Sequence, residues 1–259
     1  MNIIVNNLNI NYEIYGVQNN KTIILLHGWG TNLNSFKIMA DYLNENYKVI
    51  AIDLPGFGSS SIPDKVLNIT EYSKIIYDLL IKLNVETAVL IGHSFGGRIA
   101  ITLAGHYNYN AEKIVLINSA GIKPKRTIWY YIKVYTYKFL KKITFLMPKK
   151  IATLYIKKLR DIFGSKDYNE APEIMKGILS LVVNEDLRKY MKKIKAPTLL
   201  LWGQKDSTTP ISDAVKMKKT IPDSGLIALE GAGHYSYLDK HYEIKKIILY
   251  FLKSNKLSK

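Results

Sequence analysis

The sequence of 259 residues contains no cysteine, and this absence removes several kinds of chemistry at once. Disulfides, cysteine-based zinc sites and thiol nucleophiles are all excluded. The chain also has no run of about 18 uncharged apolar residues, which a membrane-spanning helix needs. Its first residues lack a basic segment followed by a long apolar run, so we expect no signal peptide and a cytoplasmic protein.

Acidic side chains are scarce as well, and one long window has none. The chain carries 21 Asp and Glu against 37 Lys and Arg, for a formal net charge of +16. From Lys113 to Arg160 all thirteen charged residues are Lys or Arg. This charge raises nucleic-acid binding as a function, but no nucleic-acid motif accompanies it, and a basic patch alone is weak support. We therefore do not expect nucleic acid as the primary partner.

Short apolar runs that end in turn residues predict the buried strands of a parallel sheet. They span residues 22–30, 47–58, 87–97, 113–121, 196–206 and 225–234. Each run is too short for an independent helix and too continuously apolar for a sheet with one wet face. At the N-terminus, Ile10, Tyr12 and Ile14 alternate with polar residues, which predicts a half-buried strand.

Helical patterns lie between these strands. They include residues 32–47, 68–84 and 241–255, and Thr70 is the expected cap at the start of the second. Alternating strands and helices predict an α/β fold, a mostly parallel twisted sheet with helices on both faces.

One segment breaks the alternation. From Ile122 to about Asp186 only helical patterns occur, so we interpret 122–186 as a helical cap inserted between two strands. Residues 1–121 and 187–259 then form the core domain. Ligands in open α/β sheets bind beyond the carboxyl ends of the strands, and the insertion begins there.

The segment LIGHSFGG, residues 90–97, contains the pattern G-x-S-x-G with Ser94 at its centre. A serine held in a sharp strand-to-helix turn needs small residues two positions away on either side, here Gly92 and Gly96. The pattern is common by accident. Here it follows an apolar strand and opens a helical stretch, so Ser94 is the predicted nucleophile.

A serine hydroxyl needs a base, and the chain offers five histidines. His234 alone lies on a glycine-flanked loop after the last predicted strand, so we predict it to be the base. His27 and His93 lie beside glycine turns, where an imidazole more often braces the backbone. His106 and His241 fall on stretches that the pattern predicts to be exposed.

The base in turn needs an acid to orient it. Asp206 follows a predicted strand and is the expected acid. Asp53 follows an earlier strand and is expected to brace the turn after it. The other place for an acid, the end of the strand at Ile117, holds Asn118 and Ser119.

Negative charge on a substrate oxygen needs preorganised donors. Gly28 lets the chain turn so that the backbone N–H of Trp29 can point into the site. The N–H of Phe95 lies beside the nucleophile at a helix N-terminus, whose dipole helps. The Trp29 and Phe95 side chains are also predicted to line the substrate pocket.

The motifs H-G-W-G, D-x-P-G-F-G-x-S, G-H-S-F-G-G, W-G-x-x-D and G-x-G-H, in this order and spacing, resemble those of an α/β-hydrolase of the single-cap, esterase-like branch. The resemblance covers nearly the whole chain. It implies that Ser94, Asp206 and His234 form the triad, and that Trp29 and Phe95 supply the oxyanion hole. It also implies that 122–186 is the cap.

Departures from related families narrow the chemistry. Dehalogenases and epoxide hydrolases of this fold use an Asp nucleophile, so Ser94 argues against both. Meta-cleavage C–C hydrolases usually have Asn before the nucleophile, whereas this chain has His93. A C–C hydrolase is thereby disfavoured but stays open.

The expected function is hydrolysis of small to medium acyl esters through an acyl-enzyme, with no metal and no organic cofactor. A C–C hydrolase or thioesterase on the same triad is the alternative. The alternative outside enzymes is a receptor of this fold, which binds a ligand with little turnover. The expected partner is a small acyl ester, while acyl length, leaving group and oligomeric state are left open.

The segment IWYYIKVYTYKFLKK, residues 128–142, has two unlike faces when drawn as a helix at about 100° per residue. Its lysines occupy one half of the circumference: Lys133, Lys138, Lys141 and Lys142. An apolar arc occupies the other: Ile128, Ile132, Tyr135, Phe139 and Ile143. We predict that Ile132, Tyr135 and Phe139 line the acyl pocket. The cationic face is either a solvated surface or a docking face for anionic lipid headgroups or an acidic carrier protein.

Overall fold

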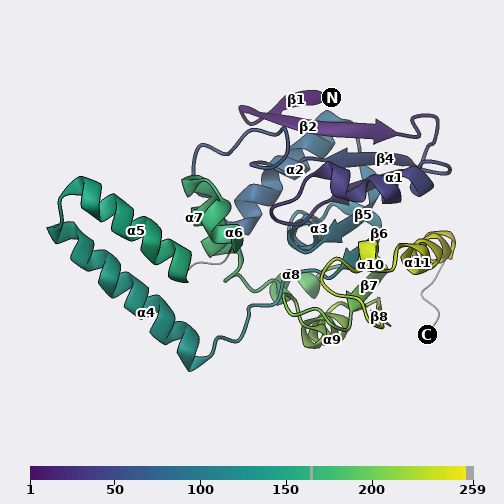
Figure 1. The fold of residues 1–259 in the computed structure, drawn as a ribbon. Coiled ribbons are helices and arrows are strands. Elements are labelled where there is room, and N and C mark those ends of the chain that lie inside the picture. The colour runs from purple at the N-terminus through teal and green to yellow at the C-terminus, as the bar shows by residue number, and fades with distance from the viewer. Residues whose placement is uncertain (164–165, 255–259) are drawn as a thin grey trace.

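The computed structural model describes residues 1–163 and 166–254, and these contain one sheet of eight strands. The strands are β1 (Asn2–Val5), β2 (Leu8–Tyr15), β3 (Thr22–Leu26), β4 (Lys48–Ile52), β5 (Thr87–His93), β6 (Asn110–Ile117), β7 (Thr198–Gly203) and β8 (Ser224–Leu229). Their order across the sheet is β1-β2-β4-β3-β5-β6-β7-β8 (Figure 1).

The sheet is mostly parallel, as the sequence predicts. Only β2 runs antiparallel to its neighbours β1 and β4, while the pairs from β4 to β8 are all parallel. The six predicted strands are β3 to β8, and the predicted N-terminal strand is β2. The prediction that all six are buried is wrong for β8, because this strand lies at the edge of the sheet, where only Leu229 is buried. Ile10 and Tyr12 of β2 are buried, whereas Ile14 is partly exposed.

Helices follow most strands. They are η1 (Leu33–Phe36), α1 (Lys37–Leu43), α2 (Ile69–Lys82), α3 (Phe95–Gly105), α4 (Ile128–Ile143), η2 (Thr144–Leu146), α5 (Lys149–Phe163), α6 (Lys166–Glu170), α7 (Glu173–Val182), α8 (Arg188–Met191), α9 (Ile211–Thr220), α10 (Ser236–Asp239) and α11 (His241–Lys253). The predicted helical patterns at 32–47, 68–84 and 241–255 are thus confirmed as helices that end at Leu43, Lys82 and Lys253, and residue 255 lies outside the described residues.

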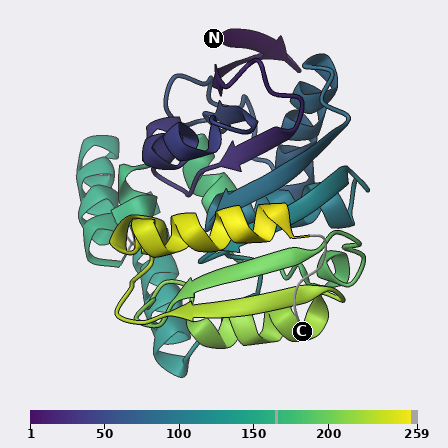
Figure 2. The ribbon, with the colours of Figure 1, turned by 90° about the vertical axis from the view of Figure 1, so that its right-hand side faces the viewer.

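Alternate residues of the central strands face two separate cores, because successive side chains of a strand point to opposite faces. Ile24 of β3 and Leu90 of β5 pack with α2, α3 and α9. Ile23 and Ile91 of the same strands pack on the other face with α1 and α11. In Figure 2, α11 is drawn in yellow on that second face. Helices on both faces are therefore confirmed.

The start of α2 corrects one sequence prediction. Asn68 caps the helix, not Thr70: its side chain accepts from the N–H of Glu71 at 2.9 Å, and the Glu71 carboxylate accepts from the N–H of Asn68 at 2.9 Å. The Thr70 hydroxyl supports this cap by donating to Asn68 at 2.7 Å. Both residues are good caps, but only Asn68 has a Glu three positions later to complete a capping box.

The chain between β6 and β7 carries α4 to α8, where the sequence predicts a cap. The two ends of the predicted insertion are tied together: the N–H of Leu187 donates to the carbonyl of Gly121 at 2.8 Å. The N–H of Lys123 also donates to Asp186 at 3.3 Å. These two hydrogen bonds support boundaries at 122 and 186. We propose that 122–186 is a cap domain and that 1–121 with 187–259 is the core domain.

The insertion has two unlike parts. Helix α7 packs into the core through buried Met175, Ile178 and Val182. Helices α4 and α5 instead pack against each other and stand out from the sheet as a hairpin (Figure 1). We call α4, η2 and α5 the hairpin below.

Candidate active site

Ser94 lies in a strained turn between β5 and α3. Its backbone has φ 48° and ψ −107°, a conformation that costs a non-glycine residue free energy and that clusters at functional sites. The N–H of Ser94 donates to the carbonyl of Ile117 at 3.1 Å, and its carbonyl accepts from Ala120 at 3.0 Å. The end of β6 therefore holds the turn in place.

The two flanking glycines are required by close packing. A Cβ atom on Gly92 would lie 2.6 Å from the carbonyl carbon of Gly96. A Cβ on Gly96 would lie 1.9 Å from the carbonyl oxygen of Leu26 in β3. Both distances are far below van der Waals contact, so the G-x-S-x-G pattern lets α3 begin directly against the strands and presents Ser94 at their carboxyl ends.

Asp206 lies just after β7 and is surrounded by donors. Its Oδ1 accepts from the backbone N–H groups of Thr208 and Thr209 at 2.8 and 2.9 Å. Its Oδ2 lies 2.6 Å from both Asn118 Nδ2 and the Thr209 hydroxyl. Burial alone would raise the pKa of Asp206, but these bonds and one from His234 outweigh it and lower the pKa to about 2. The carboxylate is therefore ionised at neutral pH.

His234 follows β8 and pairs with this carboxylate. Its Nδ1 lies 2.9 Å from Asp206 Oδ2. An ionised carboxylate only accepts, so Nδ1 carries the proton and Nε2 keeps its lone pair in the neutral ring. The loop is anchored beside the histidine, because the N–H of Gly233 donates to Asp239 at 2.8 Å. This arrangement leaves Nε2 able to accept a proton.

His93 braces the His234 loop, as the sequence predicts for a histidine beside a glycine turn. Its Nε2 donates to the backbone carbonyl of His234 at 2.9 Å. Its Nδ1 is buried, and no described residue bonds to it. Burial, with a smaller contribution from the neighbouring His234 ring, lowers the pKa of His93 to about 3. His93 is therefore neutral.

His27 and Asp53 brace the first loop in the same way. The N–H of Leu54 donates to His27 Nε2 at 3.0 Å, so Nδ1 carries the proton that it donates to the Gly28 carbonyl at 2.7 Å. Burial lowers the pKa of His27 to about 4, although the bond to Gly28 opposes the shift. The Asp53 carboxylate accepts from Leu33 and Ser59, each at 2.8 Å. The predicted bracing role of both residues is confirmed.

The loop after β3 lies beside the nucleophile candidate. A Cβ on Gly28 would lie 3.5 Å from Ser94 Cβ. No described residue accepts a hydrogen bond from the N–H of Trp29 or of Phe95, so both donors are available. The Trp29 ring packs edge-on against Phe57 and Phe95, with ring centres 4.9 and 5.2 Å away. Trp29 and Phe95 thus lie together next to Ser94.

The cap residues predicted for the pocket lie elsewhere. Ile132, Tyr135 and Phe139 are exposed on α4, which packs with α5 and η2 rather than over Ser94. Helical periodicity tells which side chains share a face, but not which partner that face meets. Their role as pocket lining stays a prediction that the structure does not support.

Three polar residues of the site were not assigned a role from the sequence. Asn118 bridges the acid and its surroundings: its amide donates to Asp206, and its Oδ1 accepts from the Ser236 hydroxyl. Thr209 contributes both a hydroxyl and a backbone N–H to Asp206. Asn118 directly follows a predicted strand, at a position where an acid would also fit, and this is the signal in the sequence that points to it.

Comparison with known proteins identifies the family of the chain. The model of the alpha/beta hydrolase fold family matches residues 21–241. The chain belongs to this family. It is 28% identical to the AB hydrolase superfamily protein YisY of Bacillus subtilis, over 90% of this chain and 92% of that protein. It is also 28% identical to the uncharacterized hydrolase YugF of the same organism, over 96% of both chains.

A solved structure extends the likeness to an esterase. The esterase of Exiguobacterium antarcticum superposes with a TM-score of 0.75 at 25% identity, covering 98% of this chain and 99% of that one. Membership of the alpha/beta hydrolase fold family, with relatives named as hydrolases and an esterase, makes this chain a hydrolase. Among its described residues, no group of three or more His, Asp or Glu could hold a metal ion.

Proposed function

We propose that this hydrolase cleaves small to medium acyl esters, with Ser94 as nucleophile, His234 as base and Asp206 as the acid that orients the base. The observation that carries the proposal is the His234–Asp206 pair, 2.9 Å apart, on loops at the same sheet edge as the strained Ser94 turn. A serine hydroxyl, an imidazole and an ionised carboxylate are the parts of a serine-hydrolase triad, and of these the imidazole–carboxylate pair is formed here.

The reaction would run in two halves. His234 Nε2 takes the hydroxyl proton of Ser94 as Oγ attacks the ester carbonyl, and then gives that proton to the departing alcohol. The acyl group stays on Ser94 until a water, deprotonated by His234, attacks it and releases the acid. Asp206 stabilises the imidazolium that forms in each half.

Trp29 and Phe95 would stabilise the tetrahedral intermediates through their backbone N–H groups. Neither donor is bonded to another described residue, and Phe95 begins helix α3, where the helix dipole favours negative charge. One such donor is worth about 10²- to 10³-fold in kcat. The rings of the same two residues would form one wall for the acyl chain.

Two further relatives bear on which bond is cleaved. The chain is 27% identical to the pimeloyl-[acyl-carrier protein] methyl ester esterase of Wigglesworthia glossinidia brevipalpis, over 89% of this chain and 93% of that one. It is 24% identical to the 2-hydroxy-6-oxo-6-phenylhexa-2,4-dienoate hydrolase of Comamonas testosteroni, over 90% and 88%. We prefer the ester, because His93 stands before the nucleophile, and keep C–C and thioester cleavage as the alternatives.

A panel of p-nitrophenyl esters from acetate to palmitate tests the proposal. We expect turnover with acetyl to octanoyl esters and a fall in kcat/KM for longer chains. Matched thioesters, lactones and a vinylogous 1,5-diketone in the same buffer separate the alternatives. If no ester is turned over above the buffer rate while the diketone is cleaved, C–C bond hydrolysis replaces ester hydrolysis as the proposed function. If nothing is turned over, a receptor-like role replaces both.

We also propose a cytoplasmic location.

A further inference from the structure

The hairpin carries large apolar side chains that no described part of the protein covers. Phe139 is 66% exposed, and Phe145 and Leu146 at its turn are 92% and 85% exposed. Trp129 near the start of α4 is 74% exposed. The inner face of the hairpin is different, since Leu159 and Thr144 are buried there. The exposed side chains are therefore additional to those that hold the two helices together.

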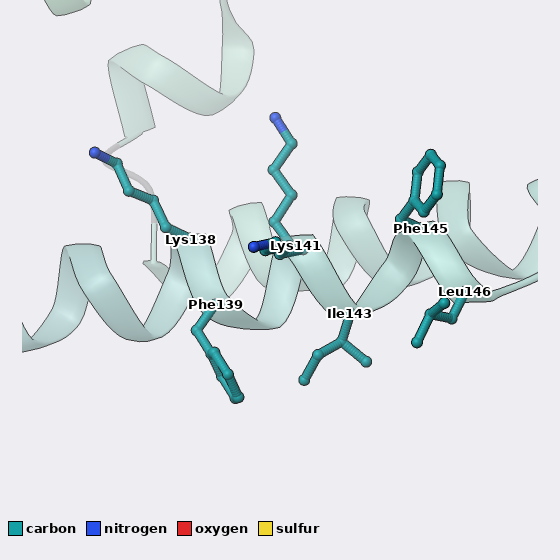
Figure 3. Close-up of a pocket in the computed structure, with 7 residues that line it drawn as sticks. Lys138, Phe139, Lys141, Ile143, Phe145 and Leu146 are labelled. Carbon is teal, nitrogen blue, oxygen red and sulfur yellow. The ribbon is translucent and has the colours of Figure 1, made fainter.

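Apolar side chains of α4 share one face. Ile128, Ile132, Tyr135, Phe139 and Ile143 recur at helical spacing along α4. Figure 3 shows Phe139, Ile143 and Leu146 pointing to one side, while Lys138, Lys141 and Phe145 point to the other. The residues around them line an open hollow of about 700 Å³: Lys138, Phe139, Lys141, Lys142, Ile143, Phe145 and Leu146. We call the apolar residues on this one side the α4 stripe: Ile128, Ile132, Tyr135, Phe139, Ile143 and Leu146.

Positive charge surrounds the α4 stripe. No acidic residue occurs from Lys113 to Arg160. The exposed lysines of the hairpin are Lys133, Lys138, Lys141, Lys142, Lys149, Lys150 and Lys158. The ammonium of Lys138 lies 5.7 Å from the centre of the Tyr135 ring, so charge borders the stripe directly.

An anionic lipid surface fits this combination better than a second copy of the chain or a purely polar anion does. A second copy of the chain would bring two strongly cationic hairpins together, which like-charge repulsion opposes. A purely polar anion would leave Phe139, Phe145 and Leu146 in water. A helix with lysines on one side and Trp, Phe and Leu on the other is typical of interfacial helices. None of the described helices is long and apolar enough to cross a membrane.

We propose that the hairpin docks on the surface of a bilayer that contains anionic lipid. The α4 stripe enters the boundary between headgroups and acyl chains, and the lysines lie against the lipid phosphates and carboxylates. Docking goes beyond ester hydrolysis and does not depend on it, because none of the hairpin residues belongs to the Ser94, Asp206 and His234 set.

Vesicle co-sedimentation tests this proposal. We expect the full chain to bind vesicles with 30 mol% phosphatidylserine in phosphatidylcholine at least about tenfold more tightly than pure phosphatidylcholine vesicles. The difference is expected to shrink at high salt, because screening weakens attraction to the surface. Trp129 provides a second readout: its fluorescence is expected to shift to the blue and to be quenched by brominated lipid, and the change is lost in Trp129→Phe.

Matched variants locate the surface. Lys138→Gln with Lys142→Gln is expected to weaken binding about 30-fold, as for two lysines near an anionic surface. Lys246→Gln with Lys253→Gln on α11 removes the same charge outside the hairpin and is expected to change binding less than about twofold. Phe145→Ser with Leu146→Ser is expected to abolish quenching by brominated lipid. Circular dichroism checks that each variant is folded.

Three outcomes would overturn the proposal. Equal binding to neutral and anionic vesicles would remove the role of the lysines. If the lysine substitutions on α4 and on α11 weakened vesicle binding equally, the net charge of the chain rather than the hairpin would account for binding. A dimer in sedimentation equilibrium that Phe145→Ser with Leu146→Ser converts to monomer, with no vesicle binding by either form, would assign the stripe to a second copy.

Discussion

Replacing Ser94 with alanine is expected to lower kcat for the best ester of the panel by about 10⁴-fold or more. The substitution removes the attacking oxygen, so no acyl-enzyme can form. The backbone donors of Trp29 and Phe95 would remain and leave only a small residual rate. Steady-state hydrolysis of the p-nitrophenyl ester, followed at 405 nm at saturating ester concentration, measures the loss at about pH 7.

Ser119→Ala is the matched control. Ser119 is a buried serine at the end of β6, and its hydroxyl donates to the Ala120 carbonyl at 2.8 Å rather than to the site. We expect this variant to keep kcat within a few-fold. Undiminished hydrolysis by folded Ser94→Ala protein would remove Ser94 from the mechanism.

Acidification from pH 7 to pH 5 is expected to destabilise the fold by about 4 kcal/mol. The pKa values of the buried His27 and His93 are lowered to about 4 and about 3, so both stay neutral in the folded chain at pH 5. In the unfolded chain a histidine has a pKa of about 6.5 and becomes charged over this range. Protonation therefore favours the unfolded state.

The magnitude follows from linkage. Each unit of pH below the unfolded pKa costs about 1.4 kcal/mol per histidine, so 1.5 units cost about 2 kcal/mol each. The loss begins near pH 6.5 and continues until the pH reaches the folded pKa. Asp206 does not contribute in this window: its lowered pKa gives stability that is lost only as the pH falls through about 4 toward 2.

Urea unfolding at pH 7, 6 and 5 measures the effect. His93→Gln is expected to lose about half as much stability on acidification as the unsubstituted chain. A free energy of unfolding that stays constant from pH 7 to pH 5 would show that the two rings become charged in the folded chain.

The fold could be predicted because its signals are local. Buried parallel strands are continuous apolar runs, and those that became β3 to β8 needed no long-range information. The same holds for Ser94, whose turn demands Gly92 and Gly96 within two residues. Asp206 and His234 could be placed because each follows one of these strands, and parallel strands bring their carboxyl ends to one edge.

The rest depends on contacts between distant segments. Asn118 and Asp206 are 88 residues apart, and only the pairing of β6 with β7 brings them together. The cap of α2 depends on Glu71, which forms a capping box with Asn68 and stands too close in sequence to form one with Thr70. The position of the hairpin was not readable at all, because the amphipathic pattern of α4 suits a pocket wall and a docking face equally.

The central claim is that Ser94 is the activated nucleophile of a serine hydrolase, and covalent labelling tests it most directly. The folded protein is incubated with a fluorophosphonate, and the modified residue is identified by peptide mass spectrometry alongside Ser94→Ala. We predict one adduct per chain, on Ser94, formed within minutes near neutral pH and absent from the variant. A folded, unlabelled protein, or an adduct that persists in Ser94→Ala, would contradict the account.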